Sequence, residues 1–224
     1  MKTDDATLNG QAVQITSSIE AAKLNCTAGL GGFSVSKRIG IGNKARIDSV
    51  GRIKIGSVFS NMRELPEVGD LKQAVVDLTL ERFLSDIAES LEHKEQGLLM
   101  TAEDDIMIDN MQGVVTLHTS KASNIALHTV ESAKMVINAP NAHVSLNLKS
   151  IHDLSMIHCT SAELLIGEGF DACDIYDVSK GKLFDRASNS YVDELPSGDR
   201  PLLKILAADK LTVRVMSDFE ILRR

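Results

Sequence analysis

Apolar residues recur between residues 98 and 166 as short triplets, in which one residue of any type separates two apolar ones. Several of the central residues are small or polar, and such alternation predicts short β-strands. The segments between the triplets are rich in Ser, Asn and Asp and predict turns. Successive triplets begin 8 to 10 residues apart, at Leu98, Ile106, Val115, Ile125, Met135, Val144, Leu154 and Leu164.

A strand of about four residues cannot bury its apolar side alone, but a stack of such units can. The pattern therefore predicts a mostly β fold, with two alternatives for its architecture. One is a single-chain parallel β-solenoid, in which two units form a coil of about twenty residues. The other is an intertwined trimeric β-prism, in which three chains each contribute one face. In the solenoid two core columns are expected, one of Val115, Met135 and Leu154 and one of Ile125, Val144 and Leu164.

The first sixty residues are also expected to form β-strands. Within them Ile41, Ile47 and Ile53 follow one another at intervals of six, which resembles the hexapeptide pattern of left-handed β-helices over about two repeats. Further apolar triplets of the kind described above begin at Val13, Leu24, Phe33, Ile39 and Ile53.

One amphipathic helix is predicted as an insertion between the two β regions, at about residues 70–96. Asp70 can cap its N-terminus with Gln73 three residues on, and Gly97 suits its end. The helix is expected to pack on the side or end of the β structure, with a short coiled-coil seam as the alternative. Its apolar face comprises Val76, Leu80, Phe83, Leu84, Ile87 and Leu91.

The periodicity fades after Ile166 and returns near the C-terminus. We therefore divide the chain into five segments. These are an N-terminal β-rich region (1–60), a linker and amphipathic helix (61–97), a β-helical repeat region of about ten residues per unit (98–166), an irregular loop (167–200), and closing strands or a cap (201–224).

The composition narrows the classes of partner. A net charge of -7 argues against a nucleic-acid-binding surface, which would need clustered Lys and Arg. No apolar run is long enough for a stable membrane span, and the N-terminus lacks the apolar region of a signal peptide, so synthesis in the cytoplasm is expected. The three cysteines, Cys26, Cys159 and Cys173, form no CxxC motif and predict reduced, partly buried thiols.

Two groups of residues are weak candidates for metal binding. His118 and His128 follow inward triplets, and in a trimer each would recur around the axis, where three imidazoles could ligate a metal. The HxH spacing of such sites is absent, which favours surface histidines on different faces of a coil. Asp171, Asp174 and Asp177 form a DxxDxxD cluster that could hold Ca²⁺, but the spacing matches no EF-hand and favours a solvated loop.

No catalytic residue and no cofactor is predicted from the sequence, because it contains none of the common nucleophile, phosphate-binding or metalloprotease motifs. His158 and Cys159 are adjacent, but neighbours in a strand point to opposite faces. A carbohydrate-active or acyl-transferring β-helix enzyme is the alternative from a different class. It would need paired carboxylates in a groove or a histidine near a cleft, and the hexapeptide-like region 1–60 contains no histidine.

Residues 97–166 resemble the β-helical needle of VgrG-type secretion spikes and phage baseplate spikes. The similarity is carried by Leu98–Met100, Ala102–Ile108 and Val115–Leu117, and by MVINAPNAHVSLN at 135–147. It implies a homotrimeric, SDS-tolerant and non-enzymatic structural component, found in a virion or a secretion apparatus. Its expected partners are further copies of itself and other assembly proteins. A scaffold that polymerises end to end through open coils is the alternative within the structural class.

Overall fold

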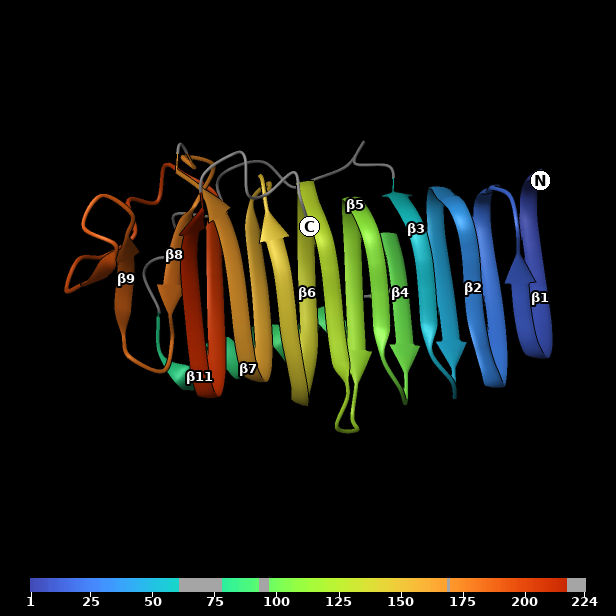
Figure 1. Ribbon diagram of the computed structural model, residues 1–224, viewed down its shortest axis with the longest axis horizontal. Coiled ribbons are helices and arrows are strands. Elements are labelled where there is room, and N and C mark those ends of the chain that lie inside the picture. The colour runs from blue at the N-terminus through green and yellow to red at the C-terminus, as the bar shows by residue number, and fades with distance from the viewer. Residues whose placement is uncertain (61–77, 93–96, 169, 217–224) are drawn as a thin grey trace.

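The computed structural model describes residues 1–60, 78–92, 97–168 and 170–216, and within them it is mostly β with one helix. Figure 1 shows strands that lie side by side along one long axis, with the N-terminus at one end. The elements are β1 (Lys2–Ile15), β2 (Ile19–Ser49), β3 (Ile53–Ser60), α2 (Leu80–Glu92), β4 (Gly97–Ala102), β5 (Ile106–Thr119), β6 (Asn124–Leu148), β7 (Leu154–Gly167), β8 (Asp174–Asp177), β9 (Lys182–Asp185), β10 (Ser190–Val192) and β11 (Leu202–Met216).

Strand pairing is parallel from β1 through β7 and on to β11 and β8. Residues that face each other across neighbouring strands are separated by nearly constant intervals, such as 19 for Ile106 and Ile125 and 20 for Val115 and Met135. Each turn of the chain therefore lies on the previous one after about two of the ten-residue units seen in the sequence. We call each such turn a coil.

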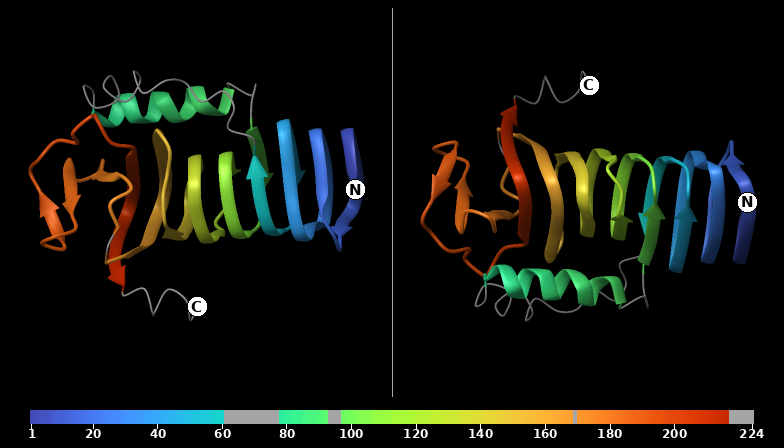
Figure 2. Two further views of the ribbon diagram at one scale, coloured as in Figure 1. Left: turned by 90° about the horizontal axis from the view of Figure 1, so that it is seen from above. Right: turned by 90° about the horizontal axis from the view of Figure 1, so that it is seen from below.

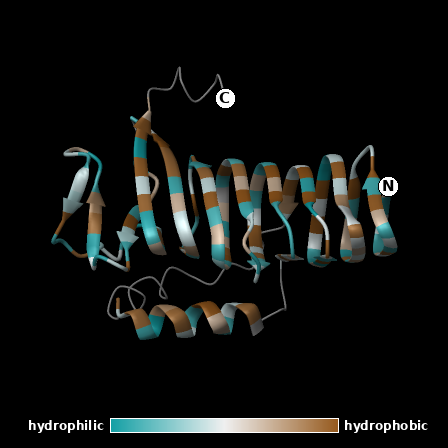
Figure 3. Cartoon of the chain, turned by 60° about the horizontal axis from the view of Figure 1, so that its bottom comes forward, coloured by the Kyte–Doolittle hydropathy of each residue, from teal (hydrophilic) through white to brown (hydrophobic). Residues whose placement is uncertain are grey.

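The β regions before and after the helix belong to one stack. Ile53 of β3 faces Ile106 of β5, and Ile47 of β2 faces Met100 of β4. The segment that contains α2 therefore leaves the stack and returns to it without interrupting the order of the coils. Figure 3 shows that apolar and polar residues alternate along most strands, as expected for strands with one side in a core.

The core consists of columns of aliphatic side chains. One column contains six residues from successive coils, and the accessible surface of each is 0% of its reference value. They are Ile47, Met100, Leu117, Ile137, Ile157 and Ile205. Because these aliphatic side chains lie directly above one another in successive coils, they pack without large aromatics, which agrees with the low aromatic content of the chain.

The first predicted core column is correct for two of its three members. Val115 faces Met135, but the next coil places Ser155 at this level, where its hydroxyl accepts the Met135 backbone N–H at 3.0 Å. Ser155 is completely buried, whereas Leu154 and Met156 lie on the outer side of β7. The orientation predicted for this triplet was therefore wrong. The reason is that α2 covers the outer side of β7 and provides a second place to bury apolar side chains.

In the second predicted column the last member was wrong, because the residue that faces Val144 lies two positions before Leu164. Val144 faces Ala162, whereas Leu164 faces Leu146. The register of β6 and β7 shifts between Ala139 and His143, so the interval falls from 20 to 18 residues on passing that point. A constant coil length of twenty residues does not predict such a change of register.

Helix α2 lies along one side of the stack (Figure 2). It is shorter than the predicted 70–96, and the proposed cap at Asp70 is outside the described residues. The hydroxyl of Thr79 accepts the Arg82 backbone N–H at 3.3 Å and caps the described helix. Phe83 and Ile87 are buried as predicted, but Leu80 and Leu84 are 49% and 39% exposed, because the contact with the coils is narrower than the apolar face.

The two ends of the stack differ. At one end β1 pairs only with β2 among the described strands. At the other end the first half of β11 pairs with β8, and the antiparallel strands β9 and β10 continue the sheet beyond it. Figure 2 shows these short strands at the end farthest from the N-terminus. Three short strands therefore lie within the segment predicted as an irregular loop, 167–200.

Candidate functional site

The two histidines of the Leu-His-Thr repeat lie on different faces of the coil, as expected. His118 of β5 has its Nδ1 atom 3.0 Å from the backbone oxygen of Asn138. His128 of β6 is exposed, and its Nδ1 atom is 3.1 Å from Oδ1 of Asp109 on the preceding coil. Among the residues that the structure describes, no three His, Cys, Asp or Glu side chains gather closely enough to hold a metal ion.

A polar column on the outer surface was not recognised from the sequence. His118, Asn138 and His158 face one another on three successive coils, at intervals of 20 residues. The Nδ1 atom of His158 is 3.2 Å from Oδ1 of Asn138. The constant interval of 20 was a signal that could have grouped these three residues. Asn138 lies between the two imidazoles and contacts both of them, so we call this column a hydrogen-bonded ladder.

Helix α2 covers the end of this ladder. Phe83 and Ile87 pack against Val136 and Met156, and the ring of Phe83 contacts that of His158 edge to face at a centroid distance of 6.4 Å. Burial under the helix lowers the pKa of His158, because desolvation disfavours the charged imidazolium. The contact beneath the helix therefore includes one imidazole whose pKa is held below its ordinary value.

We expect acidification to weaken the docking of α2. The pKa of His158 is lowered when the helix is docked, so the undocked state binds more protons below about pH 6.5, and docking is strongest above that value. Hydrogen exchange of the α2 amides, corrected for intrinsic rates, should therefore report more frequent opening at pH 5.5 than at pH 7.5. His158→Gln should remove this dependence, and His128→Gln should keep it. Equal opening at both pH values in the wild type would refute the expectation.

The three aspartates of the DxxDxxD cluster are held by protein groups. Oδ1 of Asp171 accepts hydrogen bonds from Arg186 at 2.7 Å and from Arg200 at 2.5 Å, and the two guanidinium groups lower the pKa of that carboxyl. Oδ2 of Asp174 accepts the Ser197 backbone N–H at 3.1 Å. These contacts tie the irregular segment together, and both arginines come from later positions in the chain.

Asp177 is completely buried and ends a core column, since it faces Ile205 of β11. Its Oδ1 atom accepts the backbone N–H of Ser179 at 3.0 Å and the hydroxyl of the same residue at 2.6 Å. The ammonium group of Lys180 lies 3.1 Å from Oδ2. The carboxylate therefore organises the turn that follows β8, and its partners differ from those of the other two aspartates.

The three cysteines are buried and unpaired. Desolvation raises the pKa of Cys159 to about 12, and that of Cys173 to about 12. Cys159 points into the core while His158 lies on the outer side, under α2. A thiol that stays protonated and points away from the neighbouring imidazole is not activated as a nucleophile.

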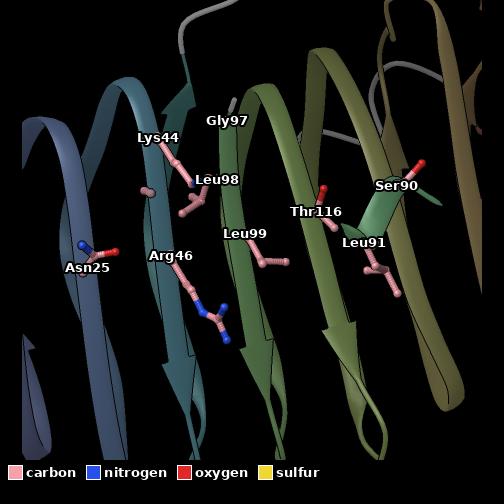
Figure 4. A pocket seen from close by; sticks show the side chains of 10 residues that line it. Asn25, Lys44, Arg46, Ser90, Leu91, Gly97, Leu98, Leu99 and Thr116 are labelled. Atoms are coloured by element: carbon pink, nitrogen blue, oxygen red, sulfur yellow. The ribbon is translucent and has the colours of Figure 1, made fainter. Parts of the chain in front are cut away.

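A cleft of about 210 Å³ lies between the last turn of α2 and the coils (Figure 4). Arg46 at its edge donates to Oδ2 of Asp48 at 2.6 Å, and the hydroxyl of Ser90 donates to the backbone oxygen of Asp86 at 2.7 Å. Among the described residues, the lining holds no carboxylate or imidazole that could act as a general base. It consists of Asn25, Lys44, Ala45, Arg46, Ser90, Leu91, Gly97, Leu98, Leu99 and Thr116.

No family model, curated protein or solved structure matches this chain. Within the described residues no helix has both the length and the hydropathy that a membrane crossing requires. The candidate sites are a hydrogen-bonded ladder, two ionic clusters and a cleft whose described lining residues include no acid–base pair.

Proposed function

We propose that this chain is a single-chain parallel β-solenoid that serves as a rigid structural element and associates with further copies of itself through its N-terminal coil. Support for the solenoid comes from the pairing of successive coils, because each partner strand belongs to the same chain. In the trimeric β-prism the corresponding partners would come from three chains. The expected membership of a phage-like or secretion-type assembly rests on the pattern at residues 97–166 and remains part of this proposal.

The proposed association is supported by the incomplete burial of the apolar side chains of β1. Leu8 and Val13 point toward the core but stay partly exposed, whereas Cys26 and Phe33, which face them on β2, are almost completely buried. The outer edge of β1 also carries backbone N–H and C=O groups with no partner strand among the described residues. A second chain placed on this edge would pair these groups and cover the apolar side chains.

The opposite end favours a closed oligomer over a filament. A filament joined end to end would need both ends of the stack to accept another coil. At the second end β8 already pairs with the first half of β11, and β9 and β10 lie beyond β8. Within β11, the residues from Lys210 to Met216 pair with β7 alone among the described strands.

The oligomeric mass of matched β1 variants tests this proposal. The wild type should exceed the 24.3 kDa of one chain in mass photometry and light scattering. Leu8→Lys should give a monomer, because an inward lysine on an edge strand opposes strand addition. Thr7→Lys, which adds the same charge on the outer side of the same strand, should leave the mass unchanged. A monomeric wild type would overturn the proposal.

A further inference from the structure

A groove of about 480 Å³ lies on the outer surface near the N-terminal end of the stack. It crosses four successive strand segments from β1, β2 and β3, which the pairing of these strands brings side by side. Its volume lies within the range of small-molecule sites. The groove is lined by Lys2, Thr3, Asp4, Glu20, Ala21, Ala22, Arg38, Gly40, Ile41, Gly42 and Phe59.

Two outward positions in the floor of this groove lack side chains, and of these Gly42 is exposed whereas Gly40 is buried. Neither Gly40 nor Gly42 has a positive φ, so the backbone does not require glycine there. An added Cβ would come no closer than 3.3 Å to a heavy atom at Gly40 and 3.4 Å at Gly42. At Gly51 on the same stack the corresponding distance is only 2.3 Å, to a backbone oxygen. Packing therefore explains Gly51, and the side chain of Glu20 restricts the space at Gly40, whereas Gly42 leaves the groove open.

Four charged side chains line the groove, and none of them has an ion-pair partner among the described residues. They are Lys2, Asp4, Glu20 and Arg38. Some opposite charges on the surface of the stack are paired at short distances, as in Arg52 with Asp105 at 3.0 Å. The four groups sum to zero charge and keep their donors and acceptors available to a ligand.

One wall of the groove is aromatic. Phe59 is 42% exposed, and the guanidinium carbon of Arg38 lies 4.9 Å from the centroid of its ring. This contact holds the Arg38 group beside the groove and leaves the edges of the guanidinium free to donate hydrogen bonds. The site therefore combines an apolar ring, a flat floor of backbone and Ala22, and hydrogen-bonding groups of both signs.

We propose that this groove binds a neutral saccharide. A sugar ring presents C–H groups that can lie on Phe59 and on the glycine floor, and its hydroxyls can both donate to Asp4 or Glu20 and accept from Lys2 or Arg38. An anionic ligand would be repelled by the two carboxylates, and a cationic ligand would be repelled by the two basic groups. This balance of charges favours a neutral compound. The proposal goes beyond the structural role and does not rest on it.

Binding to a printed array of neutral and acidic oligosaccharides tests the proposal, followed by NMR titration with the strongest neutral compound. The wild type should bind a neutral compound. Gly42→Val should weaken that binding by at least about tenfold, because the new side chain fills the exposed floor of the groove. Glu20→Gln should weaken it less, since an amide keeps one acceptor oxygen.

Ser34→Val is the matched control, because it adds the same side chain at another outward position of β2 and should bind as the wild type does. Thermal melts of the three variants check that the fold is kept. The proposal is overturned if no neutral saccharide binds, if only acidic ones bind, or if Gly42→Val binds as tightly as the wild type.

Discussion

Replacing Leu127 by Asp is expected to unfold the stack of coils. Leu127 is 1% exposed and faces Ile108 within the aliphatic core, where the described residues offer no cation to a carboxylate. Burying an unpaired charge in such a place costs roughly 4–5 kcal/mol or more, which approaches the whole stability of an ordinary domain. Circular dichroism at 25 °C should show loss of the β signal, or a melting temperature far below that of the wild type.

His128→Ala is the control for this substitution, one residue further along the same strand. The His128 side chain is 58% exposed, and its contact with Asp109 is a surface pair of low energy. Its removal should change the free energy of unfolding by no more than about 0.5 kcal/mol. If both variants shifted the melting curve equally, the assignment of Leu127 to the inner side would be wrong.

Gly113→Ala should produce the second large effect. Gly113 has a φ of 90°, which an L-residue rarely adopts, and an added Cβ would overlap the backbone oxygen of Ser60. Neither problem can be relieved by rotating a side chain, so β5 would have to move away from the neighbouring coil. We expect a loss of at least about 3 kcal/mol in the free energy of unfolding, measured by urea denaturation.

Gly42→Ala is the matched control for Gly113→Ala. Gly42 has no positive φ, and its added Cβ would meet its nearest heavy atom at an ordinary contact distance of 3.4 Å. This variant should be as stable as the wild type or about 0.4–1 kcal/mol more stable, because alanine restricts the unfolded chain. A large destabilisation by Gly42→Ala, or none by Gly113→Ala, would contradict the role given to these two glycines.

The apolar triplets identified most of the core because period-two alternation depends only on which side of a strand faces inward. Leu117 and Leu127 follow this rule, and both are buried. The rule failed at Leu154 and Met156, where a tertiary element covers the outer side of the strand. Alternation in one segment cannot reveal that a helix from another part of the chain will cover it.

The candidate sites were less accessible to sequence analysis. Asp171 was a weak candidate for cation binding and was expected to lie in a solvated loop, because its partners Arg186 and Arg200 are distant in sequence and become neighbours only through the fold. The groove was missed for the same reason, although a signal existed. Glu20, Gly40 and Phe59 are separated by intervals of 20 and 19 residues, close to the length of one coil.

The position of the helical segment has a consequence for how this chain is built. Ser60 lies beside Gly113, and Gly97 lies beside Val114, so the ends of the excursion occupy two places that are consecutive on the next coil. Residues 61–96 thus interrupt the coil path at what would otherwise be a single peptide bond. The excursion is therefore an insertion that adds no residues to the coil itself. What depends on the excursion is the outer face with Val136 and Met156, which would be exposed to water without α2.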